Sequence, residues 1–131
     1  MKKCIPILFV LIAACQKPCP DDLSTCVFSQ KPDSVYINLD LTINDENPSV
    51  LYEIFKNRYE GNNENRVFVG ETFNRETSVL LPPGYYTAKA IYNRDNDTVW
   101  VFNRGQSKVI SYDCDFACYD IKEAKINARL R

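Results

Sequence analysis

The sequence predicts an all-β domain, an antiparallel β-sandwich of about seven or eight strands, and two observations carry this prediction. Apolar and polar residues alternate with a period of two in several segments, most clearly over residues 34–43. Turn-forming residues separate these segments roughly every 8–12 residues, a spacing typical of sandwiches and barrels. No segment has a convincing apolar stripe of period 3.6, so we expect no long helix.

The first 14 residues have the layout of a cleaved export signal. Lys2 and Lys3 form a positive start, and an apolar run follows. This run has about ten residues, whereas a membrane-spanning helix needs roughly 20. It ends in Ile12-Ala13-Ala14-Cys15, which resembles the lipobox of bacterial lipoproteins: a branched apolar residue and two small residues before the cysteine that receives the lipid. An ordinary signal peptide with an incidental cysteine is the alternative.

The resemblance to lipoproteins implies a membrane anchor at Cys15. Cleavage would fall between Ala14 and Cys15, and the cysteine would carry diacylglycerol and an acyl chain such as palmitate. The following residue is Gln16 rather than the Asp that retains lipoproteins at the inner membrane, which implies the outer membrane. Two or more acyl chains hold a protein stably, so no membrane-binding helix is needed. The sequence leaves open whether the domain faces the periplasm or the cell surface.

Composition limits the size and the partners of the mature chain. Without the first 14 of its 131 residues, 117 residues remain, enough for one domain with a core. The removed segment holds two of the 16 basic and none of the 17 acidic residues, so the mature net charge is near −3. This acidic balance argues against a nucleic-acid partner, since phosphate binding needs a basic field.

The chain contains no histidine. Catalysis by Ser-His-Asp or Cys-His groups and the commonest metal ligand are therefore absent. We expect no enzyme activity, no cofactor and no metal. A hydrolase using a pair of carboxylates remains an alternative, with candidates in Asp40, Glu53, Glu71 and Asp113.

Four cysteines remain beside Cys15, namely Cys19, Cys26, Cys114 and Cys118. An even number in an oxidising compartment predicts two disulfides. A metal site is the alternative, but the Cys-x2-Cys spacing and histidines are lacking. We expect the local pairing, Cys19 with Cys26 and Cys114 with Cys118. The crossed pairing stays possible and would clamp the N-terminal segment onto the C-terminal part of the domain.

Residues 15–33 are expected to form a tether between the lipid and the domain. Pro18, Pro20 and Pro32 interrupt any helix or strand ladder there. The sandwich domain would then span residues 34–131. In its first strand, over residues 34–43, the inward side chains would be Val35, Ile37, Leu39, Leu41 and Ile43.

The remaining strands are assigned between turn signals. Residues 44–48 and 60–63 are turns by composition. Pro83 and Gly84 suit a type II turn, which needs a positive φ at the glycine. Residues 95–97 and the pair Arg104-Gly105 are further expected turns. Strands are therefore predicted at 50–56, 67–73, 77–81, 85–92, 98–102, 108–112 and 124–130. The composition of residues 120–131 would also suit a helix, but alternation favours a strand.

Residues 79–88, Val-Leu-Leu-Pro-Pro-Gly-Tyr-Tyr-Thr-Ala, resemble the strand–turn–strand of small immunoglobulin-like and transthyretin-like accessory domains. This resemblance implies a β-sandwich and nothing about activity.

Aromatic side chains are the candidate binding residues. Trp100 alternates with Val99 and Val101, so it points to the opposite face of its strand. An exposed subset of aromatics could stack on sugars or contact a partner protein. Trp100 is the first candidate, and Tyr86 and Tyr92 are the further ones.

Three short patterns suggest further sites. Asp33-Ser34-Val35 and Asp97-Thr98-Val99 resemble the acceptor of a bacterial O-glycosylation system for exported proteins, which implies glycans on Ser34 and Thr98. Asp95-Asn96-Asp97 could ligate Ca²⁺, but as a turn it needs no metal. Asn-Arg recurs five times, and alternating strands would place Arg58, Arg66 and Arg104 at one end of the domain and Arg75 and Arg94 at the other, so we expect solvated turn residues rather than one anion-binding patch.

The expected function is that of a lipid-anchored, non-enzymatic binding or structural module of the cell envelope. Its partner could be an envelope protein complex or a glycan. The alternatives are a glycan-binding or carboxylate-pair hydrolase domain and a self-assembling surface subunit that pairs through edge strands.

Overall fold

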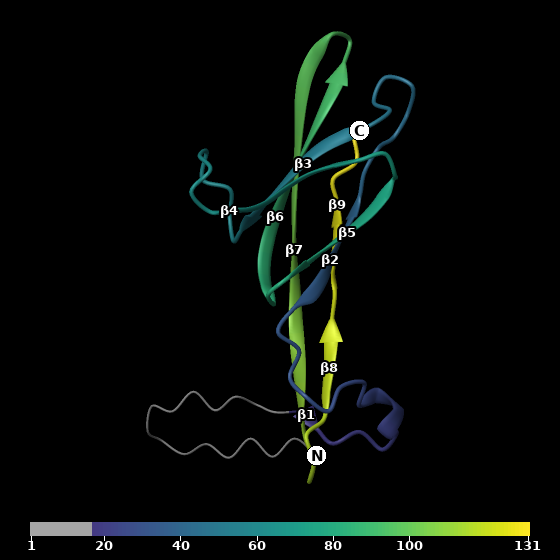
Figure 1. Cartoon of the computed structure of the whole chain (residues 1–131), viewed down its shortest axis with the longest axis vertical. Coiled ribbons are helices and arrows are strands. Elements are labelled where there is room, and N and C mark those ends of the chain that lie inside the picture. Colours follow the sequence, from purple (N-terminus) through teal and green to yellow (C-terminus); the bar gives the residue numbers. More distant parts are fainter. Residues whose placement is uncertain (1–16) are drawn as a thin grey trace.

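Two β-sheets pack face to face in the computed structural model, which describes residues 17–131 and confirms the all-β sandwich (Figure 1). The elements are β1 (Lys17–Pro18), the short 3-10 helix η1 (Leu23–Thr25), β2 (Val35–Asp40), β3 (Val50–Lys56), β4 (Arg66–Thr72), β5 (Glu76–Leu81), β6 (Gly84–Arg94), β7 (Asp97–Asp113), β8 (Tyr119–Lys122) and β9 (Ala124–Asn127). None of the helices in this described part of the chain is long and apolar enough to cross a membrane.

The larger sheet has the order β1-β7-β6-β3-β4, with β8 also paired to β7, and the smaller sheet has the order β5-β2-β9. Most neighbours run antiparallel, as expected. The pairs β1–β7 and β2–β9 are parallel, so both sheets are mixed. β8 and β9 follow one another directly, and the chain passes from the larger to the smaller sheet at Glu123. The strand interpretation of residues 120–131 is therefore confirmed, although β9 ends at Asn127.

The core lies between the two sheets and follows the period-two pattern of the sequence. In β2 the side chains of Val35, Ile37 and Leu39 are buried as predicted. In β6 the inward residues alternate in the same way, and they meet the inward residues of β3 and β9. Each fully buried aliphatic side chain, such as Ile54, contributes roughly 1.5–3 kcal/mol relative to an exposed one. Burial between the sheets therefore stabilises the sandwich.

One long strand replaces the two that were expected over residues 98–112. β7 runs without interruption through Arg104 and Gly105, so the predicted turn at this pair is wrong. Gly105 has a packing role instead. A Cβ at this position would lie 3.0 Å from Cγ1 of Ile126 and 3.4 Å from the carbonyl oxygen of Lys125. The glycine lets β9 of the smaller sheet approach β7 closely.

The turn before β6 also differs from its prediction. Gly84 has no positive φ and is already part of β6, so the expected type II turn is wrong. By contrast, the predicted turn between β6 and β7 is confirmed. Asp95 and Asn96 have φ values of 52° and 67° between the paired residues Arg94 and Asp97. Two consecutive positive φ values in a two-residue loop define a type I′ turn, which matches the twist of a hairpin.

The C-terminal part of β7, residues 108–113, extends beyond the sandwich and forms a stalk with β8 and the N-terminal segment. We define the stalk as residues 17–33 together with residues 108–122. β1 pairs with Tyr112 and Asp113, and Phe28 forms a bridge with Tyr119. Figure 1 shows the stalk at one end of the molecule and the β6–β7 turn at the other. Residues 17–33, which belong to the expected tether, are therefore paired with the hairpin of β7 and β8.

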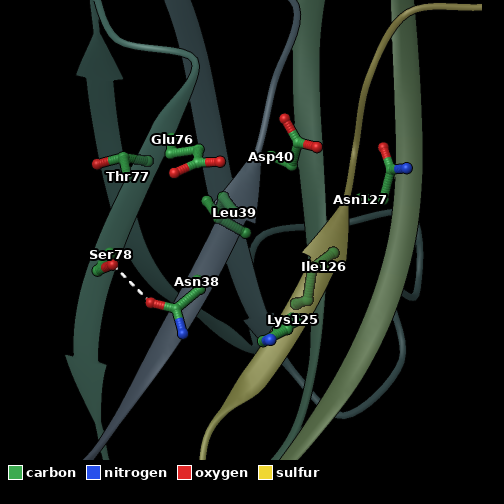
Figure 2. Close-up of a pocket in the computed structure, with 9 residues that line it drawn as sticks. All are labelled: Asn38, Leu39, Asp40, Glu76, Thr77, Ser78, Lys125, Ile126 and Asn127. Carbon is green, nitrogen blue, oxygen red and sulfur yellow. Dashed lines mark hydrogen bonds between the residues drawn. The ribbon is translucent and has the colours of Figure 1, made fainter.

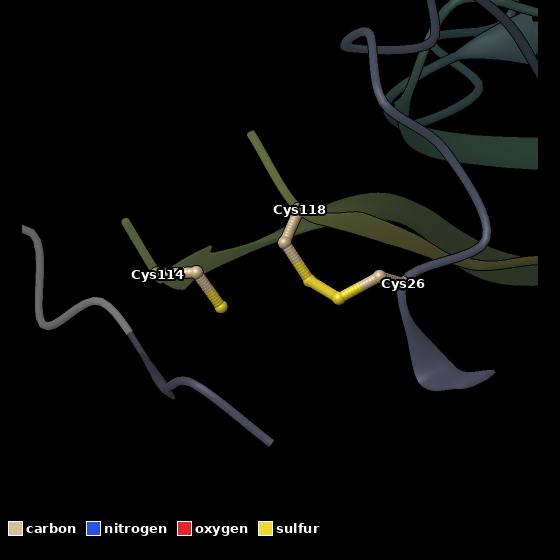
Figure 3. A group of neighbouring side chains, drawn as sticks. All are labelled: Cys26, Cys114 and Cys118. Carbon is tan, nitrogen blue, oxygen red and sulfur yellow. A yellow bond between two sulfur atoms is a disulfide. The ribbon is translucent and has the colours of Figure 1, made fainter. Parts of the chain in front are cut away.

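The four cysteines form two disulfides, as predicted, but the expected local pairing is wrong. Cys19 is bonded to Cys114 and Cys26 to Cys118. Figure 3 shows the Cys26–Cys118 bond, with the Cys114 sulfur beside it. The parallel pairing of β1 with the end of β7 places Cys19 directly beside Cys114. Sequence spacing could not reveal this long-range pairing, which staples the N-terminal segment to the stalk.

Candidate binding face on the larger sheet

The outer face of the larger sheet carries apolar side chains where a one-sided sheet is ordinarily polar. Strand pairing arranges its outward residues in rows across β4, β3, β6 and β7. One row contains Val69, Glu53, Lys89 and Phe102, and the next contains Glu71, Leu51, Ile91 and Trp100. We call Leu51, Val69, Ile91, Trp100 and Phe102 the outer apolar face. All but Ile91 are strongly exposed. A contiguous exposed apolar patch marks an interaction site.

Three charged side chains cross this face beneath the apolar ones. Nη1 of Arg66 donates to Oε1 of Glu53 at 2.6 Å, and Nζ of Lys89 lies 3.0 Å from Oε2 of the same carboxylate. Glu53 is 9% and Lys89 8% exposed. Burial alone would raise the pKa of Glu53, but hydrogen bonds from Lys89 and Arg66 and their charges outweigh it, so this pKa lies below its ordinary value. Glu53 is thus unsuited to act as a general acid, which needs a raised pKa.

Trp100 is held in place by the cation beside it. The Lys89 ammonium lies 3.9 Å from the centre of the Trp100 ring, a cation–π contact. The side chain is nevertheless 53% exposed, which confirms that Trp100 points outward. The Phe102 ring stands nearly perpendicular to it, at 83° and 6.4 Å between ring centres. The Trp100 and Phe102 rings thus form two nearly perpendicular surfaces that are already ordered in the free protein.

The loop between β3 and β4 supports the Phe102 ring from the other side. Asn57 adopts a positive φ of 62°, and its amide donates to the carbonyl oxygen of Tyr85 at 2.7 Å. The loop then lays the Tyr59 ring against Phe102 at 4.9 Å and against Phe55 at 4.8 Å. Phe55 is consequently buried although it points away from the core.

The sequence did not point to this supporting set, which consists of Glu53, Lys89, Tyr59 and Phe55. One signal could have pointed to it. Residues 50–56 are apolar on both faces of the strand, because Leu51 and Phe55 alternate with the core residues. Such a pattern indicates that the outward face is also covered or used.

Tyr86 and Tyr92 are not binding residues, which corrects the prediction. They are 2% and 1% exposed and belong to the core. Their hydroxyls are satisfied inside the protein: Tyr86 donates to the carbonyl oxygen of Pro82, and Tyr92 donates to that of Ala128 at 2.7 Å. The alternation placed both tyrosines on one face correctly but did not indicate that this face is the buried one.

The other predicted sites are spread over the molecule. Ser34 directly precedes β2, and Thr98 is exposed near the start of β7; their glycosylation stays a prediction. Cys15 lies outside the described residues, so its lipidation also stays a prediction.

The arginines do not converge on one site, and of the acidic candidates only Glu53 and Glu71 share a face. Of the four carboxylate candidates, Asp40 lies on the smaller sheet, Asp113 ends β7 in the stalk, and Glu53 and Glu71 lie on the larger sheet. The strand register also confirms the expected separation of the Asn-Arg pairs. Arg66 and Arg104 lie in the row of Phe55 and Thr87, towards the stalk end of the sandwich, whereas Arg94 borders the β6–β7 turn.

One group of potential metal ligands converges within residues 17–131. The sulfurs of Cys26, Cys114 and Cys118 lie within 4.8 Å of one another (Figure 3). All three are bonded in disulfides, so none is the thiolate that a metal requires. At the turn of residues 95–97, the Asp95 amide donates to the Glu46 carboxylate at 2.7 Å, so the loop is held by a hydrogen bond.

The outer face of the smaller sheet has a different character. A shallow hollow of about 420 Å³ lies over β5, β2 and β9 (Figure 2). Three of its polar side chains, those of Ser78, Asn38 and Asp40, are engaged with one another or with their neighbours. The Ser78 hydroxyl donates to Oδ1 of Asn38 at 2.6 Å, and Nδ2 of Asn38 donates to Glu123 at 2.7 Å. Asp40 pairs with Arg75 at 3.1 Å. This internal pairing leaves the hollow a weaker candidate than the outer apolar face.

Comparison with known proteins gives no relative for this chain. No protein-family model matches it, and no curated protein and no solved structure matches it.

Proposed function

We propose that the protein is a lipid-anchored, non-enzymatic binding module of the outer membrane, which contacts a partner through the outer apolar face. The observation that carries this proposal is the exposure of four large apolar side chains, namely Leu51, Val69, Trp100 and Phe102, on one face of the larger sheet. Contiguous apolar exposure of this kind marks binding surfaces on soluble domains. Aromatic anchors such as Trp100 are enriched among residues that dominate binding energy.

The rigidity of the face also supports a binding role. Trp100 is restrained by Lys89, and Phe102 is restrained by the Tyr59 ring. Side chains that are already ordered lose less conformational entropy when a partner binds. Strands rather than loops carry these side chains, which favours a precise contact surface.

The stalk suits an anchored protein. The lipobox resemblance places the lipid on Cys15, two residues before β1 begins. β1 lies at the end of the stalk, far from the β6–β7 turn (Figure 1). Trp100 lies about 13 residues from Asp113, the stalk end of β7, which at about 3.3 Å per residue corresponds to roughly 40 Å. The sandwich and its outer apolar face would thus stand clear of the lipid surface.

The anchoring part of the proposal is tested by the intact mass of protein purified from membranes. We expect a mature chain that begins at Cys15, carries acyl adducts and lacks four thiol hydrogens. A mass that shows an unmodified Cys15 would refute the anchor. Protease shaving of whole cells then separates a surface orientation, which gives cleavage, from a periplasmic one, which gives protection.

The binding part is tested by site-specific photo-crosslinking in native envelopes. A photo-crosslinking amino acid placed at Leu51 should yield adducts with the partner, and Trp100→Ala should abolish them. The same probe at Tyr36, which is exposed on the smaller sheet, is the matched control and should yield none. Equal adducts from both positions would contradict the proposal, and adducts only between copies of the chain would favour self-assembly instead.

A further inference from the structure

A second hollow adjoins the outer apolar face along the edge of β7. It has a volume of about 480 Å³ and lies between β7 and the segment that follows β9. Its lining includes Trp100, Phe102, Asn127, Arg94, Arg129 and Arg131. The volume falls within the range of small-ligand sites in proteins.

The hollow is positively charged although the whole chain is slightly acidic. Three arginines and no carboxylate side chain line it, while the net charge of the full chain is −1. Arg94 donates to the main-chain oxygen of Arg131. Among the described residues, neither Arg129 nor Arg131 has an acidic partner within ion-pair distance. Guanidinium groups without a counter-ion favour carboxylate or sulfate ligands, which they bind with paired hydrogen bonds.

The aromatic part of the hollow favours a ring-shaped ligand. Lys89 lies against one face of the Trp100 ring and keeps the ring in position, while about half of the side chain remains exposed. Phe102 stands nearly perpendicular beside it. An apolar ring face can stack on such a platform at a low entropy cost, because the platform is already ordered.

An extended peptide fits the same hollow less well. A peptide that joins a sheet needs an open strand edge to which it can add hydrogen bonds. Here the end of β9 and the residues after it lie beside the edge, where Nδ2 of Asn103 donates to the carbonyl oxygen of Asn127 at 2.8 Å. A strand could add there only by displacing this segment.

We infer that this hollow binds an acidic saccharide, with a sugar ring stacked on Trp100 and its carboxylate or sulfate held by Arg129 and Arg131. The inference rests on the proposed binding function and names its ligand class. The aromatic platform accounts for the sugar ring, and the arginines account for its acidic group. Neither observation alone would indicate an acidic saccharide.

The test uses tryptophan fluorescence of the full chain purified from membranes, because Trp100 is the single tryptophan of the sequence. The probe is a polyuronate oligosaccharide, and its carboxyl-reduced counterpart is the neutral control of equal length. We expect the polyuronate to shift the Trp100 emission saturably and the reduced oligosaccharide to bind at least tenfold more weakly. The affinity should fall as salt rises, since exposed charges are screened.

Variants separate this site from general attraction between charges. The double variant Arg129→Gln/Arg131→Gln should weaken polyuronate binding at least tenfold. The matched variant Arg58→Gln/Arg104→Gln removes two exposed arginines towards the other end of the sandwich and should change binding less than twofold. Trp100→Ala, measured by calorimetry, should abolish binding. Unchanged melting temperatures would show that all three variants remain folded.

Four results would overturn the inference. They are equal binding of the reduced oligosaccharide, equal losses in the two arginine variants, preferential binding of a polyglutamate peptide, and no saturable binding of polyuronate at millimolar concentration. If polyuronate fails while Leu51 still yields Trp100-dependent adducts in envelopes, the proposed binding function stands and the saccharide inference alone is wrong.

Discussion

Glu53 is the residue that balances the two cations beneath the outer apolar face. In Glu53→Gln, Lys89 would remain almost buried without a counter-ion, and Arg66 would lose its partner. Breaking a buried pair in this way lowers the free energy of unfolding by about 3 kcal/mol. Urea denaturation measures this loss. The control Asp40→Asn removes an exposed pair with Arg75 and should cost under about 1 kcal/mol; equal losses would refute the role of Glu53.

The same carboxylate predicts how stability depends on pH. Its pKa is lowered in the folded protein from an ordinary value of 4.5. The stabilisation from Glu53 is therefore fully present above the unfolded pKa and is lost as the pH falls through the folded pKa. Unfolding free energies of the wild type and Glu53→Gln, measured from pH 7 to pH 3, should converge in acid. A constant difference between the two proteins would show that this ionisation does not contribute.

Gly70 is predicted to tolerate no side chain. A Cβ there would lie 2.7 Å from Cε1 of Phe68 and 2.8 Å from Cζ of Tyr52, both on the inward side of the sheet. Gly70→Ala should therefore lower the free energy of unfolding by about 1–3 kcal/mol through overpacking. Gly84→Ala is the matched control, since its nearest new neighbour would be 3.9 Å away. Denaturation of the two variants by urea compares them directly, and equal stability would contradict the packing argument.

At the scale of elements, the hairpin of β6 and β7 should respond to its turn. Asn96 occupies a left-handed conformation with φ of 67°, which glycine adopts without steric cost. Asn96→Gly should thus raise the free energy of unfolding by about 0.5 kcal/mol, seen as a small rise in melting temperature. Asn96→Val, which strongly disfavours this conformation, should lower it. A stabilising valine would contradict the turn assignment.

The sequence predicts strands better where only one face is buried. Alternation located β2 and its inward residues, because one face of this strand meets the core. It could not locate the continuation of β7 through Gly105, since that glycine serves an approach of β9 from the other sheet. Glycine signals a turn and a close backbone contact equally well, and only the tertiary structure separates the two.

The candidate site was predicted only in part for a related reason. Trp100 was placed correctly on the face opposite Val99 and Val101. Tyr86 and Tyr92 were misjudged because both faces of the larger sheet carry large apolar residues, so aromatic character did not distinguish core from surface. The contacts of Lys89 with Glu53 and Trp100 join different strands. Which residues Lys89 contacts depends on the strand register, and the amino-acid composition does not determine that register.

For the whole molecule, we expect the free energy of unfolding to fall by unequal amounts when the two disulfides are removed one after the other. They close loops of 95 and 92 residues that almost coincide. With Cys19–Cys114 intact, the second bond closes only a short extra loop through residues 19–26 and 114–118. Removing Cys26–Cys118 by Cys→Ala at both positions should therefore cost about 3 kcal/mol, and removing both bonds about 7 kcal/mol. Urea denaturation would contradict this if the first removal cost as much as both.

The Cys19–Cys114 bond also determines the path that a pulling force takes through the molecule. A pull applied to the N-terminal side of Cys19 passes through this bond into the end of β7. Residues 20–33 then carry little of the tension. The load enters the sandwich along β7 and is resisted by its eleven residue pairs with β6, which shear together rather than open one by one. A domain tethered through this bond would keep its sheets together under a drag force that would unfold a domain whose N-terminal segment lacked the bond.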